Sequence, residues 1–136
     1  TNLVLGLNRA ALDEGLIVPV IEDVGSKSLK EISTEVNTLS DLARSGGIKP
    51  DQLVGGTFTI SVLGSVDGFT PILNQNQVAL LGVGRSQEKP VVSKGEIVIR
   101  EMMTLSLTVD HQVIDGAVAA NFCRRLQRLI ERPTRL

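Results

Sequence analysis

Short runs rich in β-branched residues alternate with two longer segments of helical periodicity, and this order constrains the fold more than any other feature of the chain. The strand-like runs occupy residues 2–7, 16–21, 55–64, 77–84, 90–93, 96–100 and 102–109. The helical segments cover residues 28–45 and 117–131. Most of the strands follow one another as hairpins do, without helices between them. The pattern therefore predicts an α/β fold, a two-layer sandwich with a mixed β-sheet and covering helices, and not a doubly wound parallel sheet.

The first helical segment has its own start and stop signals. Ser28 and Glu31 have the spacing of a capping box, and Gly46 followed by Gly47 ends the periodic pattern. Apolar residues recur at steps of three and four and mark one buried face, formed by Leu29, Ile32, Val36, Leu39, Leu42 and Ala43. We therefore expect a capped amphipathic helix that packs on the sheet.

The last helical segment shows the same periodicity, with Asp115 as its expected N-cap and Pro133 beyond its end. Its apolar face is predicted to consist of Val118, Phe122, Leu126, Leu129 and Ile130. Cys123 lies on the apolar side of this pattern, so we expect a buried thiol and not a nucleophile. With three Phe and neither Trp nor Tyr, the core has to be built from Val, Ile, Leu and Ala.

A proline and two turn residues refine the strand pattern. Pro19 has no backbone N–H to donate to a neighbouring strand. We therefore expect the run at 16–21 to lie at a sheet edge or to contain a bulge. Lys94 and Gly95 separate the runs 90–93 and 96–100 and predict a β-hairpin.

Length, charge and cysteine content exclude several classes of protein. The 136 residues suit one domain, and a net charge of −1 with 2% aromatic residues gives no reason to expect nucleic-acid binding. One cysteine cannot form an internal disulfide, and one histidine with one cysteine cannot supply a metal-ligand set. No apolar run is long enough to cross a bilayer and no signal peptide is visible, so we expect a soluble intracellular protein.

The single histidine, His111, lies between a strand-like and a helix-like segment, in the run TVDHQVIDG at residues 108–116. Imidazole is the side chain that exchanges a proton most readily near neutral pH, and two carboxylates, Asp110 and Asp115, lie within four residues of it. From the residues alone two interpretations stay open, a loop histidine hydrogen-bonded for structure and a catalytic acid or base.

Three separated segments resemble one family. Residues 55–64 (GGTFTISVLG) are similar to its GGTFTISNLG segment. The stretch FTPILN with the later ALLGVG resembles its FTPIIN and AILGVG, and DHQVIDGA at 110–117 resembles its DHRVIDGA signature. The family is the catalytic, inner-core domain of the dihydrolipoamide acyltransferases of 2-oxo acid dehydrogenase complexes, which has a chloramphenicol acetyltransferase-like fold. The likeness covers essentially the whole chain and implies that residues 1–136 are the C-terminal part of such a domain, without its N-terminal portion.

The resemblance implies an acyltransferase that moves an acyl group between a dihydrolipoyl arm, on a separate lipoylated domain, and coenzyme A. His111 would be the general base that takes the thiol proton, because a thiol has an ordinary pKa of about 8.5 and needs a base to ionise. Ser61 would stabilise the oxyanion of the tetrahedral intermediate. In the family these two residues meet across a subunit interface, which implies a homotrimer at minimum, within a larger symmetric core that binds the dehydrogenase partners. The expected location is the bacterial cytoplasm or the mitochondrial matrix.

Asp115 has two compatible roles, as a helix N-cap and as the residue that orders the histidine loop in the family. We expect no catalytic part for Asp110. Two positions depart from the family pattern, since Gln112 replaces an arginine and Val62 replaces an asparagine. Neither change removes a catalytic side chain.

Two other functions compete with acyl transfer. Ser61, His111 and Asp115 form a superficial hydrolytic triad, but Ser61 lacks the G-x-S-x-G nucleophile elbow. A shortened core domain also fits a catalytically weak or inactive scaffold subunit of the complex. We predict that the intact parent protein is active and that this part of it, if isolated, is weak or inactive. The acyl group, whether acetyl, succinyl or branched-chain, is left open by the sequence.

Overall fold

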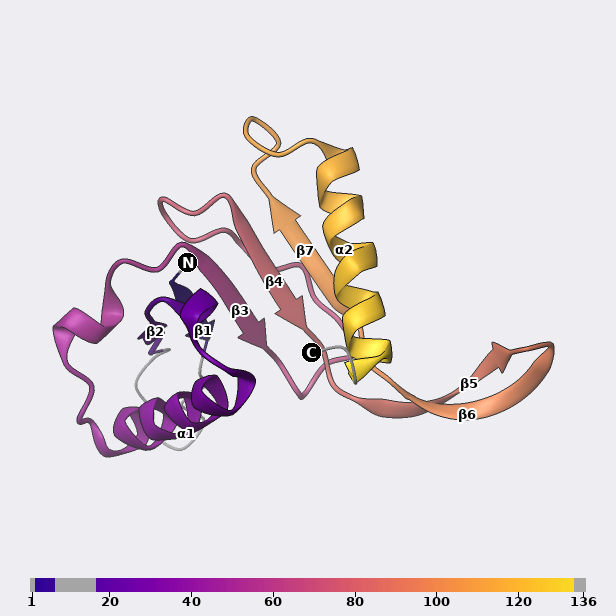
Figure 1. Ribbon diagram of the computed structural model, residues 1–136, viewed down its shortest axis with the longest axis horizontal. Coiled ribbons are helices and arrows are strands. Elements are labelled where there is room, and N and C mark those ends of the chain that lie inside the picture. Colours follow the sequence, from indigo (N-terminus) through magenta and orange to yellow (C-terminus); the bar gives the residue numbers. More distant parts are fainter. Residues whose placement is uncertain (1, 7–16, 134–136) are drawn as a thin grey trace.

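A five-stranded mixed sheet forms the centre of the protein (Figure 1). The computed structural model describes residues 2–6 and 17–133, so Leu7 and Leu16, at the ends of two predicted runs, lie outside the described part. The strand order is β2-β1-β3-β4-β7. The bounds of these strands are Leu3–Gly6 for β1, Val20–Ile21 for β2, Phe58–Val62 for β3, Ala79–Val83 for β4 and Leu105–Val109 for β7.

Parallel and antiparallel pairings are combined in this sheet. Strands β1, β3 and β4 run parallel, while β2 and β7 lie antiparallel at the two edges. The prediction of an α/β fold with a mixed sheet is therefore confirmed. The expected hairpin-like succession of most strands is wrong, because β1, β3 and β4 pair in parallel and are joined by crossovers. The expected edge position of the run at Pro19 is confirmed too, because β2 begins directly after this proline.

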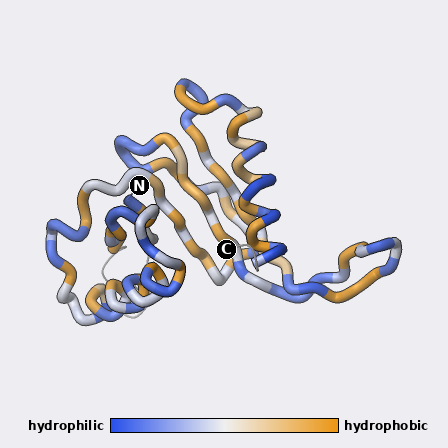
Figure 2. Tube along the Cα trace, in the orientation of Figure 1, coloured by the Kyte–Doolittle hydropathy of each residue, from blue (hydrophilic) through white to orange (hydrophobic). Residues whose placement is uncertain are grey.

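Two α-helices pack at opposite ends of the strand order. Helix α1, Leu29–Ser45, contacts β2, and helix α2, Gly116–Glu131, contacts β7. Short 3-10 helices span Val24–Ser26 and Pro50–Leu53. Figure 2 shows the apolar character of the central strands and the alternation of polar and apolar residues along both helices. Among the described residues, no helix combines the length and the apolar character that crossing a membrane requires.

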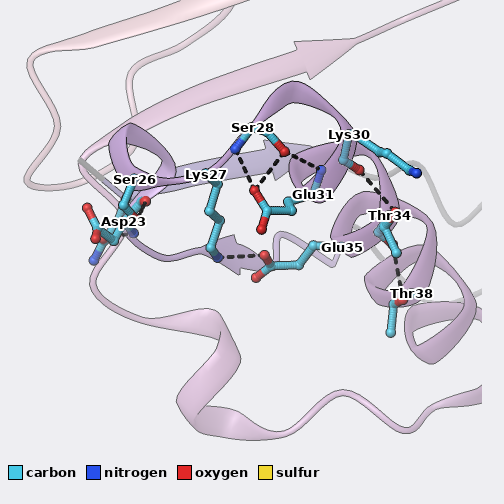
Figure 3. Close-up of polar contacts among 10 residues, drawn as sticks. Asp23, Ser26, Lys27, Ser28, Lys30, Glu31, Thr34, Glu35 and Thr38 are labelled. Carbon is cyan, nitrogen blue, oxygen red and sulfur yellow. Dashed lines mark hydrogen bonds and ion pairs between the residues drawn. The ribbon is translucent and has the colours of Figure 1, made fainter.

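The capping box predicted at the start of α1 is formed (Figure 3). The Ser28 hydroxyl accepts a hydrogen bond from the backbone N–H of Glu31 at 3.3 Å, and the Ser28 backbone N–H donates to Glu31 Oε2 at 2.7 Å. The Ser28 hydroxyl also donates to this carboxylate, at 2.6 Å. This bond, followed by the backbone donor, holds the pKa of Glu31 below its ordinary value. At the other end Gly46 adopts φ 73°, as the predicted stop requires.

We expect Ser28→Ala to lower the free energy of unfolding at pH 7 by about 1 kcal/mol, the usual loss for an N-cap. The pKa of Glu31 is depressed in the folded state, so its contribution is present above the unfolded-state pKa and is lost as pH falls through the folded value. The difference between wild type and Ser28→Ala should therefore shrink from pH 7 to pH 3 in urea unfolding. Ser33→Ala, at an exposed position within α1, is the control. A difference that is constant with pH would contradict the account.

A separate two-stranded hairpin projects from the sheet (Figure 1). It consists of β5, Gln87–Ser93, and β6, Glu96–Met102. Lys94 and Gly95 both have positive φ, 54° and 86°, as a type I′ turn requires, so the predicted turn is confirmed. The last strand was predicted to begin at Met102; instead Met102 pairs with Gln87 in the hairpin, and β7 begins at Leu105.

Helix α2 covers its sheet less fully than its sequence predicted. Phe122 packs against Phe58 of β3 with ring centroids 6.0 Å apart. Of the predicted apolar face, Val118, Phe122 and Ile130 nevertheless remain exposed, and α2 buries none of its side chains fully. The prediction of a buried Cys123 is wrong, because this thiol is exposed in a groove beside Met102 and Met103. The physical reason is that α2 lies along β7, at an edge, where only part of its apolar face meets the sheet.

The side chains of alternate residues of β3 point to opposite faces of the sheet. Phe58 faces α2, and Thr59 and Ser61 face the other side. That other side is covered by residues 69–74, the segment we name the strap. Phe69 and Pro71 of the strap lie 3.1 Å from the position that a Cβ of Gly82 would occupy. Any larger residue at this point of β4 would push the strap away.

Candidate functional site

The loop that carries His111 is shaped by Asp110. The Asp110 backbone N–H donates to the carbonyl of Val78 at 2.9 Å, which ties the loop to the start of β4. The Asp110 side chain accepts a hydrogen bond from the N–H of Gln112 at 2.9 Å. Its carbonyl accepts from the N–H groups of Val113 and Ile114, at 3.0 and 2.9 Å. Asp110 thus closes a tight turn around the histidine, which makes it a positioning residue of this loop.

The motifs predict no catalytic part for Asp110, and they do not reveal this positioning role. The signal that could have found it is an aspartate at the end of a strand, because Asp side chains accept bonds from backbone N–H groups two residues further on.

His111 stands exposed at the end of the sheet, directly before α2. Its Nε2 lies 4.0 Å from the position that a Cβ of Gly116 would occupy. The ring is therefore held beside the first turn of α2, with its surface open to solvent. The exposure rules out a ring enclosed in an apolar interior.

Asp115 occupies the N-cap position of α2, with φ −70° and ψ 151°. Its carbonyl accepts the helical hydrogen bond from the N–H of Ala119 at 3.1 Å. The expected side-chain capping bond is not formed. The position of the cap is thus confirmed, while the Asp115 carboxylate, four residues after His111, stays exposed.

Ser61 lies on β3 and is half-buried in a cavity of about 280 Å³ beneath the strap. The cavity is lined by apolar and polar side chains from β3, β4, the strap and the segment before β2, namely Val18, Thr59, Ser61, Phe69, Thr70, Pro71, Ile72, Asn74 and Leu80. A hydroxyl on such a wall can donate a hydrogen bond to an oxygen within the cavity. An apolar lining beside it suits a small acyl chain.

Within one chain Ser61 and His111 lie far apart. Ser61 lies opposite Gly82 of β4, and Gly82 lies opposite Ser106, near the beginning of β7. His111 instead follows the end of β7. Strands β3 and β7 point in opposite directions in Figure 1. At about 3.3 Å per residue and 4.8 Å per strand, Ser61 is roughly 14 Å from Val109 at the end of β7, and His111 lies beyond that end.

The separation has two consequences. The triad that a hydrolase would need is not assembled within the chain, because a nucleophile and its base have to be within hydrogen-bond reach. A site that uses both residues requires Ser61 from one copy and His111 from another. For metals, no group of three or more His, Cys, Asp or Glu side chains that could hold an ion occurs among residues 2–6 and 17–133.

Comparison with known proteins gives a consistent result. The family model for 2-oxoacid dehydrogenases acyltransferase (catalytic domain) matches residues 8–136. The acetyltransferase component of the pyruvate dehydrogenase complex of Staphylococcus aureus is 44% identical over 126 residues, and its counterpart from Staphylococcus epidermidis is equally similar. The match covers 91% of this chain and 29% of either relative, so the chain spans less than a third of their length.

Solved structures agree with these relatives. The dihydrolipoamide acetyltransferase of Azotobacter vinelandii matches with a TM-score of 0.84 and 42% identity, over 94% of this chain and 52% of that one. That enzyme was studied for the role of a serine, a histidine and an asparagine in its catalytic mechanism. A probable dihydrolipoamide acetyltransferase from Listeria monocytogenes matches with a TM-score of 0.88 and 32% identity, over 96% of this chain and 55% of that one. The chain belongs to the 2-oxoacid dehydrogenase acyltransferase family.

Proposed function

We propose that the protein containing this chain transfers an acyl group between a dihydrolipoyl arm and coenzyme A, with His111 as general base and Ser61 as donor to the oxyanion. One observation supports these roles above all. In the Azotobacter vinelandii enzyme the asparagine follows the histidine by four residues, and the serine precedes the histidine by 52. Here Asp115 follows His111 by four residues, and Ser61 precedes it by 50.

The proposed mechanism begins with the thiol. His111 takes its proton as the sulfur attacks the thioester carbonyl, and later returns the proton to the departing sulfur. The negative charge that forms on the carbonyl oxygen receives a hydrogen bond from the Ser61 hydroxyl. Asp110 fixes the loop in which the imidazole sits, and Asp115 lies at the other end of this loop. The exposure of His111 supports this mechanism, because a long flexible arm can reach the ring.

The experiment that tests the function is acetyl transfer from acetyl-CoA to dihydrolipoamide by the full-length protein. Acetyl is the chosen probe because the relatives at 44% identity are acetyltransferases. Thioester formation is followed by absorbance, and a steady rate that depends on both substrates is expected. If the protein is folded but catalyses no transfer, the result would favour the alternative function, a scaffold subunit of the complex. Burst release of a covalent acyl-serine would instead indicate a hydrolase.

The proposal includes assembly into a homotrimer and a larger symmetric core with the lipoylated domain and the dehydrogenase components. The distance between Ser61 and His111 within one chain supports a shared site. A related structure, 41% identical, is that of the cubic core of the pyruvate dehydrogenase multienzyme complex. The named relatives are bacterial, which favours the cytoplasm over the mitochondrial matrix.

The projecting hairpin offers a surface for this assembly. Val92, Ile97 and Ile99 are 76%, 78% and 71% exposed and lie on one face of the β5–β6 ribbon. Solvent-exposed apolar residues in such a cluster are typical of a protein interface. Strand β7 adds an edge whose outer side has no partner strand in the described sheet.

We expect the double substitution Ile97→Lys and Ile99→Lys to reduce the mass of the assembly, because charged side chains oppose burial of this face in an interface. Sedimentation velocity measures the change, and circular dichroism confirms that the variant is folded. Glu96→Lys is the matched control, since Glu96 is exposed on the same strand and points to the other face. An unchanged mass for the double variant would exclude this face from the interface.

A further inference from the structure

The wall of the Ser61 cavity is an irregular segment that is tied to the sheet at few points. Within the described part of the chain, hydrogen bonds join the strap to the sheet at two places. Asn74 Nδ2 donates to Thr59 Oγ1 at 2.9 Å, and Thr108 Oγ1 donates to the carbonyl of Pro71 at 2.7 Å. Thr59 and Thr108 lie opposite Leu80 on its two neighbouring strands. The two hydrogen bonds to the strap therefore start from the same row of residues across the sheet.

The tie at Thr59 is part of a longer polar network. The Thr59 hydroxyl accepts the bond from Asn74 and donates to Gln77 Oε1 at 2.6 Å. Gln77 Nε2 in turn donates to the carbonyl of Gly56 at 3.2 Å. Thr59 is 2% exposed and is the one buried polar residue among those that the structure describes. With one bond donated and one accepted, this hydroxyl has a fixed orientation.

Thr59 is placed where it can act on Ser61. The two residues lie on the same face of β3, two positions apart, and both line the cavity beneath the strap. A hydroxyl donor stabilises an oxyanion most strongly when water is excluded and the donor needs no reorganisation. Exclusion of water depends here on the strap, which forms the wall opposite Ser61.

We propose that Thr59 is a positioning residue for acyl transfer, which acts through Asn74 to hold the strap closed over the Ser61 hydroxyl. The inference rests on the proposed function and adds a residue to it. Thr59 itself touches no reacting atom. Gln77 completes the arrangement, because it fixes the Thr59 hydroxyl in the orientation that accepts the Asn74 amide.

The test is steady-state acetyl transfer by the full-length protein carrying Thr59→Val. Valine keeps the β-branched shape that the strand requires and removes only the hydroxyl, which leaves Asn74 Nδ2 and Gln77 Oε1 without this partner. We expect kcat to fall about tenfold while the KM for dihydrolipoamide changes little, because the lost contact matters in the transition state. Thr59→Ser should restore most of the rate. Thr57→Val, at an exposed threonine whose hydroxyl bonds Asn2, is the control and should leave the rate unchanged.

A double-substitution cycle separates positioning from general stability. If Thr59 acts through Ser61, Thr59→Val should cause no further loss of kcat in a Ser61→Ala background. The same tenfold loss in both backgrounds, or an unchanged kcat for Thr59→Val, would overturn the proposal. If Thr59→Val does not fold, Asn74→Ala removes the same bond from an exposed residue and should give the same loss. Failure of the proposed function is distinct from these outcomes, because it appears as absence of transfer in the unsubstituted protein.

Discussion

Replacing His111 with alanine is expected to lower kcat for acetyl transfer by about 10²- to 10⁴-fold, the usual contribution of a general base. The thiol then has no positioned group to accept its proton, and only the small ionised fraction reacts. The measurement is the rate of transfer from acetyl-CoA to dihydrolipoamide by the full-length protein. Gln112→Ala is the matched control, since it changes the neighbouring exposed side chain and keeps the backbone N–H that bonds Asp110.

The dependence on pH adds a second readout. A raised concentration of thiolate compensates for a missing base, so the rate of His111→Ala should rise with pH more steeply than that of the unsubstituted protein. Equal rates for the variant and the unsubstituted protein at every pH would show that His111 is not the base.

Ser61→Ala is expected to lower kcat by about 10²- to 10³-fold, the loss typical of removing one oxyanion donor. The KM should change little, since the donor acts on charge that develops in the transition state. Ser106→Ala is the control, because Ser106 lies on the same row of the sheet, two strands from Ser61, and away from His111. An equal loss in both variants would indicate a general structural effect.

Mixing the two inactive variants tests whether the site is shared between copies. In one chain Ser61 and His111 lie at opposite ends of the sheet, so a Ser61→Ala chain still offers His111 to a neighbour that offers Ser61. Random co-assembly of Ser61→Ala and His111→Ala chains should therefore restore about a quarter of the wild-type rate in a cyclic oligomer. A mixture as inactive as its components would mean that both residues act within one subunit.

Local features were the most predictable part of this fold. The capping box of Ser28 and Glu31, the turn at Lys94 and Gly95 and the edge strand after Pro19 all lie where the sequence placed them. Each depends on residues that are neighbours in the chain, so hydrogen-bonding capacity and allowed φ angles are sufficient to predict it.

The candidate site was only partly predictable. The residues Ser61, His111 and Asp115 came from motifs, and the structure places all three beside solvent or a cavity. The side-chain contacts were not foreseen: Asp110 shapes the histidine loop, whereas the Asp115 side chain forms no capping bond. A loop with this spacing of Asp110, His111 and Asp115 can adopt several conformations, and packing against the rest of the protein determines which one forms.

The sequence by itself determined the identity and order of the helices and strands, the mixed character of the sheet and the residue types able to perform acyl transfer. Only the tertiary structure decided that Cys123 is exposed, that Val92, Ile97 and Ile99 form an exposed face, and how far apart Ser61 and His111 lie within one chain. The physical reason is that periodicity depends on residues within a few positions of one another, whereas burial and proximity depend on which faces meet across the sheet. Strand register, which links Ser61 to Ser106 through Gly82, is set by these distant contacts.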